Sequence, residues 1–464
     1  MPPSTTRSRP ASTTTPAPTP RRSATSRSFP SGPRRSPARL PAERILLNTD
    51  VLVVGGGPAG ASVGYWLAQA GHDVTVVEKR PVPRHKACGD ALTPRALREL
   101  ALLDVDPLAL GGHRLNGVRM VHGTREATVP WPEHPDLPSH SVALRRDVLD
   151  TELRRHATAA GAHVLMGHEA TGPIVERGFV RGAGMATDTE LAAGLTRVDS
   201  VRSRFLVVAD GANSSFGRAL GTTRHRNWPY GIASRTYFAS PRSSESWIES
   251  ILGIPDTAGN PIAGYGWVIP LGDGTLNVGV AVLSTYRDVR GVNALKLLER
   301  FTHRIAERWE IDPSVKLKAP TRFRIPLGGS VGPKMGPTFL VAGDAAGLAN
   351  PFNGDGVDAA LMSGRLAAEV LDEALTTGNS TTLQRYPTVL NDAVGQFHKV
   401  GRLSARFLGR PMVLRPALRL GLHSDRAMGA ILRIAANELR DQRPGGAERT
   451  YAIANTISKF APNW

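Results

Sequence analysis

The feature that most constrains the fold is a short apolar run that ends in a glycine-rich turn. Asp50–Val54 is predicted to form a buried strand, and Gly55-Gly56-Gly57-Pro58-Ala59-Gly60 follows it directly. The next residues have helical spacing up to Ala70, and Asp73–Glu78 is predicted to form a second strand. Strand, helix and strand make one βαβ unit, so we expect an α/β fold that begins with a Rossmann-type domain.

Gly55, Gly57 and Gly60 have the GxGxxG spacing of a turn that binds a pyrophosphate. The first glycine permits a tight turn, the second lets the backbone approach the phosphates, and the third lets helix and strand pack closely. The spacing alone is weak evidence, because 48 of the 464 residues are Gly. Glu78 strengthens it, since a carboxylate at the end of the second strand can accept hydrogen bonds from ribose hydroxyls. Ala59 and Lys79 belong to the same predicted cofactor-binding set.

A second acid at a strand end separates FAD from NAD. The predicted strand Thr338–Ala342 runs into Gly343-Asp344-Ala345-Ala346-Gly347, and a long helix is predicted to start near Gly356. Asp344 can bind ribityl hydroxyls, and the helix N-terminus can face the flavin atoms on which negative charge gathers during reduction. A nicotinamide needs neither feature, so FAD is the predicted cofactor. Its predicted contacts here are Gly343, Asp344, Gly354 and Gly356.

Four motifs, taken together and in this order, resemble the geranylgeranyl reductase family of FAD enzymes, which lies in the same superfamily as the aromatic hydroxylases. They are GGGPAG at 55–60, Lys86-Ala87-Cys88-Gly89-Asp90, Asp210-Gly211-Ala212-Asn213-Ser214 and GDAAGLANPFNGDG at 343–356. The resemblance extends from about residue 48 to about residue 440. Trp131-Pro132, Tyr230-Gly231 and Gly264-Tyr265-Gly266-Trp267 most resemble actinobacterial members that reduce one isoprene double bond of menaquinone.

The resemblance assigns roles that the local pattern does not. It implies cofactor contacts for Gly89, Arg146, Asp210 and Gly211, whereas the pattern alone indicates helix surface for Arg146 and an ordinary turn for the Asp-Gly pair. The family's substrate-cavity motif is Tyr-x-Trp-x-Phe-Pro, and this chain has Tyr265-Gly266-Trp267-Val268-Ile269-Pro270. Ile in place of Phe keeps the cavity wall apolar and leaves the preferred length of the prenyl chain open.

The predicted reaction is reduction of an isoprenoid C=C bond, in a menaquinone side chain or a geranylgeranyl group. An unpolarised alkene needs a hydride from flavin N5, a proton from an acid, and a site that excludes water. Cys88, Tyr265 and Trp267 are the predicted catalytic residues, with Cys88 and Tyr265 as candidate proton donors by their family positions. A lone cysteine is more often an inert core residue. Lys86 favours the functional interpretation, because a nearby cation lowers a thiol pKa.

The rest of the chain suggests an aromatic-hydroxylase-like or glutathione-reductase-like arrangement of parts. Residues 45–112, 141–225 and 330–376 are expected to form the FAD-binding domain. Residues 113–140 and 226–329 are expected to form an antiparallel-sheet substrate domain, because 226–285 alternates apolar and polar residues. Residues 377–464 are expected to be helical. Residues 1–44 are rich in Pro, Ser, Thr and Arg and are expected to be disordered; such a leader also resembles a transit peptide or an overextended start.

The charge and cysteine content exclude several classes of protein. Of the net +17, residues 1–44 carry +8 and residues 396–443 carry +7, so the middle of the chain is almost neutral. A nucleic-acid binder with a basic core does not fit this distribution. A single cysteine excludes an intramolecular disulfide and a cysteine-only metal cluster, and we predict no metal site. No apolar run reaches the ~18 residues of a membrane span. We expect a cytoplasmic protein.

The basic C-terminal region predicts helices with one charged face, which is either solvated or lies on an anionic membrane at the inner face of the cell membrane. Its basic residues recur at helical and at seven-residue spacing: Lys399, Arg402, Arg406, Arg410, Arg419, Arg426, Arg433 and Arg440.

Two other enzyme classes remain open from the sequence. One is a flavin monooxygenase that acts on an aromatic or polyketide-like ring, and the Lys-x-Cys-Gly-Asp and Tyr-x-Trp segments argue against it. The other is an electron-transfer flavoprotein, but the single cysteine of this chain cannot form the cluster that would bind an iron–sulfur centre. With no second nucleotide-binding motif, the electron donor is expected to be external, either NAD(P)H or a ferredoxin-type protein.

Overall fold

The computed structural model describes residues 46–460, except for 81–85, 188–197, 422–423 and 441–443. The tail over residues 1–44 that the sequence predicts to be disordered lies outside the described residues. Within the described part, two β-sheets and a set of C-terminal helices surround one large cavity.

The first sheet is built around the predicted βαβ unit. Its parallel strands run in the order β20 (Phe339–Val341), β11 (Ser200–Val208), β1 (Leu46–Val54), β2 (Val74–Glu78) and β8 (His163–Met166). Strand β1 begins at Leu46, earlier than predicted, because it pairs with β11 from Leu46 to Val54. The antiparallel strand β19 (Met335–Gly336) pairs with β20 at one edge. An antiparallel pair, β9 (His168–Glu176) and β10 (Phe179–Thr187), branches from β11 through β10.

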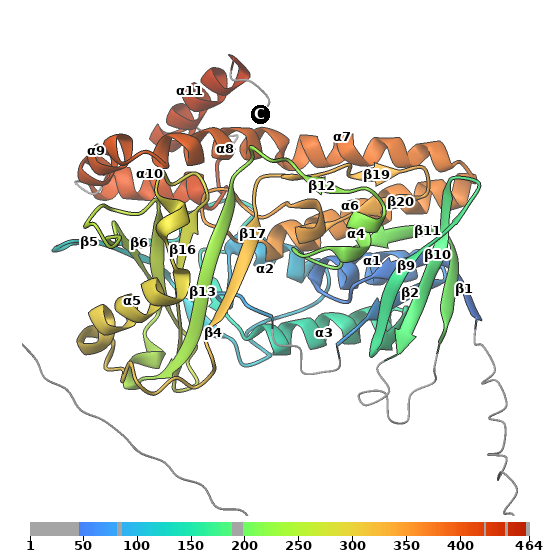
Figure 1. The fold of residues 1–464 in the computed structure, drawn as a ribbon, viewed down its shortest axis with the longest axis horizontal. Coiled ribbons are helices and arrows are strands. Elements are labelled where there is room, and N and C mark those ends of the chain that lie inside the picture. The colour runs from blue at the N-terminus through green and yellow to red at the C-terminus, as the bar shows by residue number, and fades with distance from the viewer. Residues whose placement is uncertain (1–45, 81–85, 188–197, 422–423, 441–443, 461–464) are drawn as a thin grey trace, which may run out of the picture. The chain divides into compact units, whose positions relative to one another are not determined.

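Helices α1 (Pro58–Gln69), α3 (Arg146–Ala159) and α6 (Val357–Thr377) accompany this sheet, as Figure 1 shows. The crossing of α1 and α6 depends on a small residue, since a Cβ at Gly364 would lie 2.5 Å from the carbonyl oxygen of Ala59. This contact brings the N-termini of α1 and α6 to the same region, although about 300 residues separate them in the sequence.

The second sheet has seven strands, mostly antiparallel, in agreement with the alternating pattern of residues 226–285. Its order is β17 (Thr321–Pro326), β13 (Tyr230–Ala239), β16 (Thr275–Leu283), β15 (Gly264–Pro270), β14 (Trp247–Leu252), β5 (Gly117–His122) and β6 (Arg125–Pro130). Helix α5 (Ala294–Trp309) packs on one face through Leu297, Phe301 and Ile305. The other face supplies Trp267 and Ile269 to a separate apolar cluster.

The structure accommodates the predicted domain division, which we keep as a proposal. The first sheet draws its strands from the proposed FAD-binding ranges, and the second draws its strands from 113–140 and 226–329. A small three-stranded sheet joins the two ranges, because β7 (Ser141–Ala143) pairs with both β3 (Ala91–Leu92) and β4 (His113–Leu115).

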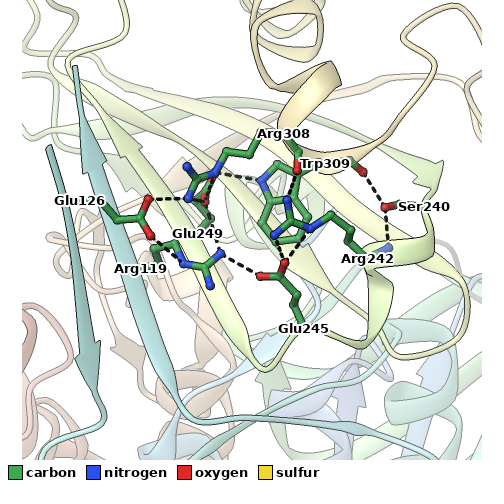
Figure 2. Close-up of polar contacts among 8 residues, drawn as sticks. All are labelled: Arg119, Glu126, Ser240, Arg242, Glu245, Glu249, Arg308 and Trp309. Carbon is green, nitrogen blue, oxygen red and sulfur yellow. Dashed lines mark hydrogen bonds and ion pairs between the residues drawn. The ribbon is translucent and has the colours of Figure 1, made fainter. Parts of the chain in front are cut away.

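Figure 2 shows a buried ionic network that fastens α5 to the second sheet. The carboxylate of Glu249 on β14 is fully buried and accepts hydrogen bonds from Arg308 Nε at 2.7 Å and Trp309 Nε1 at 2.8 Å. Arg119 lies 3.7 Å from the same carboxylate and 2.8 Å from Glu245. A buried anion that is multiply hydrogen-bonded in this way becomes costly when one of its partners is removed.

The C-terminal helices are α8 (Gln396–Leu408), α9 (Pro411–Gly421), α10 (Asp425–Ala435) and α11 (Gly446–Phe460), drawn in red in Figure 1. Met428 and Leu432 of α10 pack against Val118 and Val129 of the second sheet. No helix within the described ranges is both long and apolar enough to cross a membrane.

The predicted basic face of these helices is partly wrong. The guanidinium of Arg402 lies 3.8 Å from the ring centroid of Trp228 and donates to the carbonyl of Gly328. Arg406 donates to the carbonyl of Asn227 at 2.7 Å. These arginines fasten α8 to neighbouring loops, so they do not form a free cationic surface. Helical spacing alone could not distinguish an exposed face from one that packs on backbone carbonyls.

We predict that Glu249→Ala lowers the free energy of unfolding by about 3 kcal/mol, because it leaves Arg308, Arg119 and the Trp309 indole without their shared anion. Denaturant titration measures this. Glu299→Ala on the exposed side of α5 is the control and is expected to change the value by less than about 0.5 kcal/mol. Equal stabilities of the two variants would contradict a structural role for the network.

Candidate active site

One cavity of about 1130 Å³ brings together most of the residues that the sequence singles out. It extends from the glycine-rich turn of the first sheet, across the face of the second sheet, to helices α8–α11. The predicted residues that line it are Gly55, Gly57, Ala59, Glu78, Lys79, Cys88, Gly89, Arg146, Asp210, Gly211, Tyr265, Trp267, Asp344, Gly354 and Gly356. Gly60 and Gly343 do not line it, and they act through backbone packing.

The glycine turn leaves no room for side chains. A Cβ at Gly60 would lie 1.8 Å from the carbonyl oxygen of Gly55, and a Cβ at Gly55 would lie 2.4 Å from that of Ala209. Gly55 also has a φ of 108°, which favours glycine. The N-terminus of α1 therefore opens into the cavity with its first backbone N–H groups free of a side-chain cap. Such a terminus suits a pyrophosphate.

Two carboxylates flank this turn. Glu78 at the end of β2 is buried and accepts hydrogen bonds from the backbone N–H groups of Gly56 and Arg80, each at 3.0 Å. Asp210 follows β11, and its Oδ2 accepts from Phe216 N at 3.1 Å. Its Oδ1 is buried without a hydrogen-bond partner among the described residues, and burial raises the pKa of this carboxyl. An unsatisfied buried oxygen at the cavity wall fits a ligand that brings hydroxyl donors.

The second predicted cofactor segment lies at the N-terminus of α6. Gly343 has a φ of 59°, and a Cβ there would lie 2.9 Å from Cβ of Ala59, so the two glycine-containing turns pack against each other. Asp344 lines the cavity, and its Oδ2 lies 2.9 Å from Lys86 Nζ. Gly354 and Gly356 keep the entrance to α6 open to the cavity.

The expected effect of Lys86 on Cys88 is wrong. Lys86 pairs with Asp344, and the cation that acts on the thiol is Arg146, which is itself held by Asp150 at 2.8 Å. Burial raises the pKa of Cys88, and Arg146 offsets this only in part. The thiol is therefore protonated near neutral pH and suits a proton-donating role better than a nucleophilic one.

A buried hydrogen-bond network holds the segment that carries Cys88. Asp90 accepts from Tyr237 OH at 2.6 Å and from Asn277 Nδ2 at 2.8 Å. Asn277 Nδ2 also donates to the carbonyl of Cys88 at 2.8 Å, and its Oδ1 accepts from Trp267 Nε1 at 3.0 Å. The backbone of Cys88 and the indole of Trp267 are thus fixed by the same amide.

The aromatic wall comes from β15. Trp267 lies opposite Gly279 on β16, where a Cβ would be 2.1 Å from the indole, so the glycine makes the space for this side chain. The rings of Tyr265 and Trp267 are 5.9 Å apart, and Tyr265 OH donates to the carbonyl of Asn353. Burial, together with Asp355, raises the pKa of Tyr265, so its hydroxyl stays protonated. Ile269, which replaces the family's Phe, also lines the cavity.

Sequence reasoning missed several cavity residues. Asp355, within a quoted motif, and His168, at the start of β9, both line the cavity. The period-two pattern of β13 and β16 could have indicated Tyr237 and Asn277 as inward-facing. No sequence signal identified the C-terminal lining, which includes Leu408, Leu414, Leu418, Ile431, Leu432, Ala435, Tyr451 and Ala454.

These residues fit FAD. The uncapped α1 N-terminus suits the pyrophosphate, Glu78 and Asp210 suit ribose hydroxyls, and the N-terminus of α6 suits the electron-rich edge of a flavin. The apolar remainder of the cavity is then left for a second, largely hydrophobic molecule.

Comparison with known proteins gives consistent results. A family model described as an FAD binding domain matches residues 48–396. A menaquinone reductase from Mycolicibacterium smegmatis is 35% identical over 419 residues, covering 88% of this chain and 97% of that protein. A digeranylgeranylglycerophospholipid reductase from Methanoculleus marisnigri is 29% identical and covers 77% of this chain and 84% of that protein.

The fold is also shared with a solved structure. The geranylgeranyl bacteriochlorophyll reductase-like protein from Thermoplasma acidophilum has a TM-score of 0.68 and 24% identity, covering 89% of this chain and 97% of that chain. A match at this identity establishes the shared fold.

We predict that Gly60→Ala abolishes FAD binding, because the added methyl group would collide with the Gly55 carbonyl and displace α1 from the turn. The FAD content of the purified protein and titration with added FAD measure this. Gly172→Ala is the control, since its Cβ would meet open space. A Gly60→Ala protein that retains a full complement of FAD would contradict the assignment of the turn.

Proposed function

The chain belongs to the geranylgeranyl reductase family of FAD-binding proteins, as its motifs predicted, and we propose that it reduces a C=C bond in the isoprenoid side chain of menaquinone or of a closely related lipid. The observation that carries this proposal is the continuity of one cavity, which joins the FAD-binding residues to an apolar chamber. FAD, when bound and reduced, supplies the hydride; the protein supplies the rest of the chemistry.

The apolar chamber suits a prenyl chain. Its walls come from Trp267 and Ile269 on β15, from Val118 and Met120 on β5, and from the C-terminal helices. An isoprenoid chain offers no polar group to recognise, so binding depends on shape and on burial of apolar surface, at roughly 25 cal/mol per Å². Menaquinone differs from geranylgeranyl lipids in its ring, which can remain nearer the cavity mouth while the chain enters.

The residues near the reacting bond have three tasks: to hold the alkene, to exclude water and to provide a proton. We assign the first two to Tyr265 and Trp267, whose hydroxyl and indole N–H are already bonded within the protein and so present their apolar faces to the cavity. Cys88 and Tyr265 are the proton donors that the sequence suggests, and both are held protonated by burial.

We predict that the reduced enzyme, mixed with menaquinone in the absence of oxygen, gives a product that is heavier by two hydrogen atoms in its side chain. Mass spectrometry of the quinone measures this. Trp267→Ala is expected to lower turnover at least about tenfold while FAD stays bound, since it removes a wall of the cavity. A product that gains an oxygen atom from air would instead support a monooxygenase, and no product from any isoprenoid would contradict the proposal.

We further propose that the enzyme takes its substrate from a membrane surface. Several apolar side chains on α9 and α11 are exposed close to the part of the cavity that these helices line: Met412, Val413, Ile453, Ile457 and Phe460. Ile453, Ile457 and Phe460 recur at helical spacing on α11, next to the cavity residues Tyr451 and Ala454. Because Arg402 and Arg406 are bonded to neighbouring loops, apolar insertion would contribute more to binding than the basic face does. The electron donor is proposed to be NAD(P)H or a ferredoxin-type protein.

We predict that the double variant Ile453→Glu with Ile457→Glu binds vesicles of phosphatidylglycerol and phosphatidylcholine about tenfold more weakly than the wild type. Co-sedimentation measures this. Val315→Glu, at another exposed apolar position, is the control and should bind normally. The membrane proposal fails if the wild type ignores these vesicles at low salt, or if the double variant binds as tightly as the wild type.

A further inference from the structure

A group of acids that the motifs did not single out lies where the cavity meets the N-terminus of α6. Asp355 lines the cavity directly before α6, and its Oδ2 accepts a hydrogen bond from Thr93 Oγ1 at 2.8 Å. Its Oδ1 accepts from Val357 N at 3.2 Å. One turn along the helix, Asp358 Oδ2 faces Arg95 Nε at 3.4 Å, and its Oδ1 is buried without a hydrogen-bond partner among the described residues.

A third carboxyl lies beside the same arginine. Arg95 donates to the carbonyl of Asn437 at 3.3 Å and acts electrostatically on the next residue, Glu438. Glu438 is 1% exposed, and neither of its carboxyl oxygens has a hydrogen-bond partner among the described residues. A buried carboxyl without donors is far more stable protonated than ionised. Glu438 is therefore held in its protonated form, whereas Asp358 has the cation of Arg95 as its partner.

We propose that Asp355 is the acid that delivers the proton to the second carbon of the isoprenoid double bond, and that Asp358 is the positioning residue that keeps Asp355 protonated between turnovers. This inference rests on the proposed function. The alkene accepts a hydride on one carbon from the reduced FAD of that reaction. The O–H bond of Asp355 then breaks as a C–H bond forms on the other carbon, and the resulting carboxylate regains its proton from solvent.

Among the three candidate donors Cys88, Tyr265 and Asp355, Asp355 loses its proton at the least cost. Burial, and the nearby charge of Asp358, raise the pKa of Asp355 to about 7, close to the pH at which the enzyme must work. A general acid is most effective when its pKa lies near the operating pH. Burial raises the pKa of Cys88 above its ordinary value of 9.0 and that of Tyr265 above 10.0, and the Tyr265 hydroxyl already donates to Asn353.

The surroundings of Asp355 contain both signs of charge. Asp358 lies in the first turn of α6, Arg95 and Glu99 come from α2 (Pro94–Ala101), and Tyr265 comes from β15. The Lys86–Asp344 pair lies across the N-terminus of α6, since a Cβ at Gly356 would be 3.2 Å from Asp344 Oδ1. The cations among these groups already have partners: Arg95 faces Asp358, and Lys86 faces Asp344. Asp355 accepts its direct hydrogen bonds from a hydroxyl and from backbone N–H groups.

The test compares Asp355→Asn with Asp372→Asn, the same change at a half-exposed position further along α6. With reduced enzyme and menaquinone, the wild type should lose activity as the pH rises through about 7, because the proton donor is then ionised. Asp355→Asn should be at least about a hundredfold slower and lose this pH dependence. Asp372→Asn should behave as the wild type. Asp358→Asn should move the pH profile to lower pH, since it removes the charge that raises the pKa of Asp355.

A second readout does not depend on turnover. The pKa of Asp355 is raised in the folded protein, from an ordinary value of 3.8 to about 7. Its proton therefore stabilises the fold at low pH, and this contribution is lost as the pH rises through about 7. Relative to the wild type, the thermal midpoint of Asp355→Asn should be higher at about pH 9 than at about pH 5.

The outcomes separate the two proposals. If wild-type enzyme reduces no isoprenoid, the proposed function fails, while the pH-dependent stability of Asp355→Asn still tests whether this acid is protonated. If the wild type is active and Asp355→Asn keeps its rate and pH profile, the inference is overturned and the function stands. A pH dependence that disappears in Cys88→Ala but persists in Asp355→Asn would identify the thiol as the donor and would also overturn it.

Discussion

The rest of the structure depends on close backbone contacts at the glycine-rich turn of residues 55–60, where side chains do not fit. Gly60 has no side chain because the carbonyl of Gly55 occupies that space, and Gly55 has none because the carbonyl of Ala209, directly after β11, does. These contacts hold β1, β11 and α1 together so that the N-terminus of α1 points into the cavity. A second pair of close contacts, between Gly343 and Ala59 and between Gly364 and the Ala59 carbonyl, brings α6 to the same place. Two helix N-termini therefore face one cavity, and both attract negative charge.

The second property of the site is that several of its ionisable groups are buried away from water. Cys88, Asp90, Tyr265 and Asp355 all have pKa values raised by burial, and so all favour their protonated forms. The same low-polarity surroundings suit an isoprenoid chain and prevent water from competing for the hydride. A site that reduces an unpolarised double bond needs both effects, and here one physical cause, burial of the site, accounts for both.

How much of this arrangement the sequence predicted depends on how far apart in the sequence the interacting residues lie. The turn at Gly55–Gly60, the strand end at Glu78 and the segment from Gly343 to Gly356 are local, so their spacing identified them, and the family and the cofactor followed. The Asp90–Tyr237–Asn277 network joins residues that lie far apart in the sequence, and the motif that contained Asp90 gave no hint of its partners. The basic face of α8 was misjudged for the same reason, since only the fold brings Trp228 and Gly328 against Arg402.

The central claim is that FAD and the isoprenoid chain occupy one continuous cavity, and a titration followed through the flavin absorbance tests it most directly. A menaquinone with a fully saturated side chain cannot be reduced there, and its binding should give a saturable change in the spectrum of the oxidised enzyme. The same quinone ring with only a methyl group in place of the chain should give little or no change over the same concentrations. A spectrum that responds equally to both compounds, or to neither, would contradict the account.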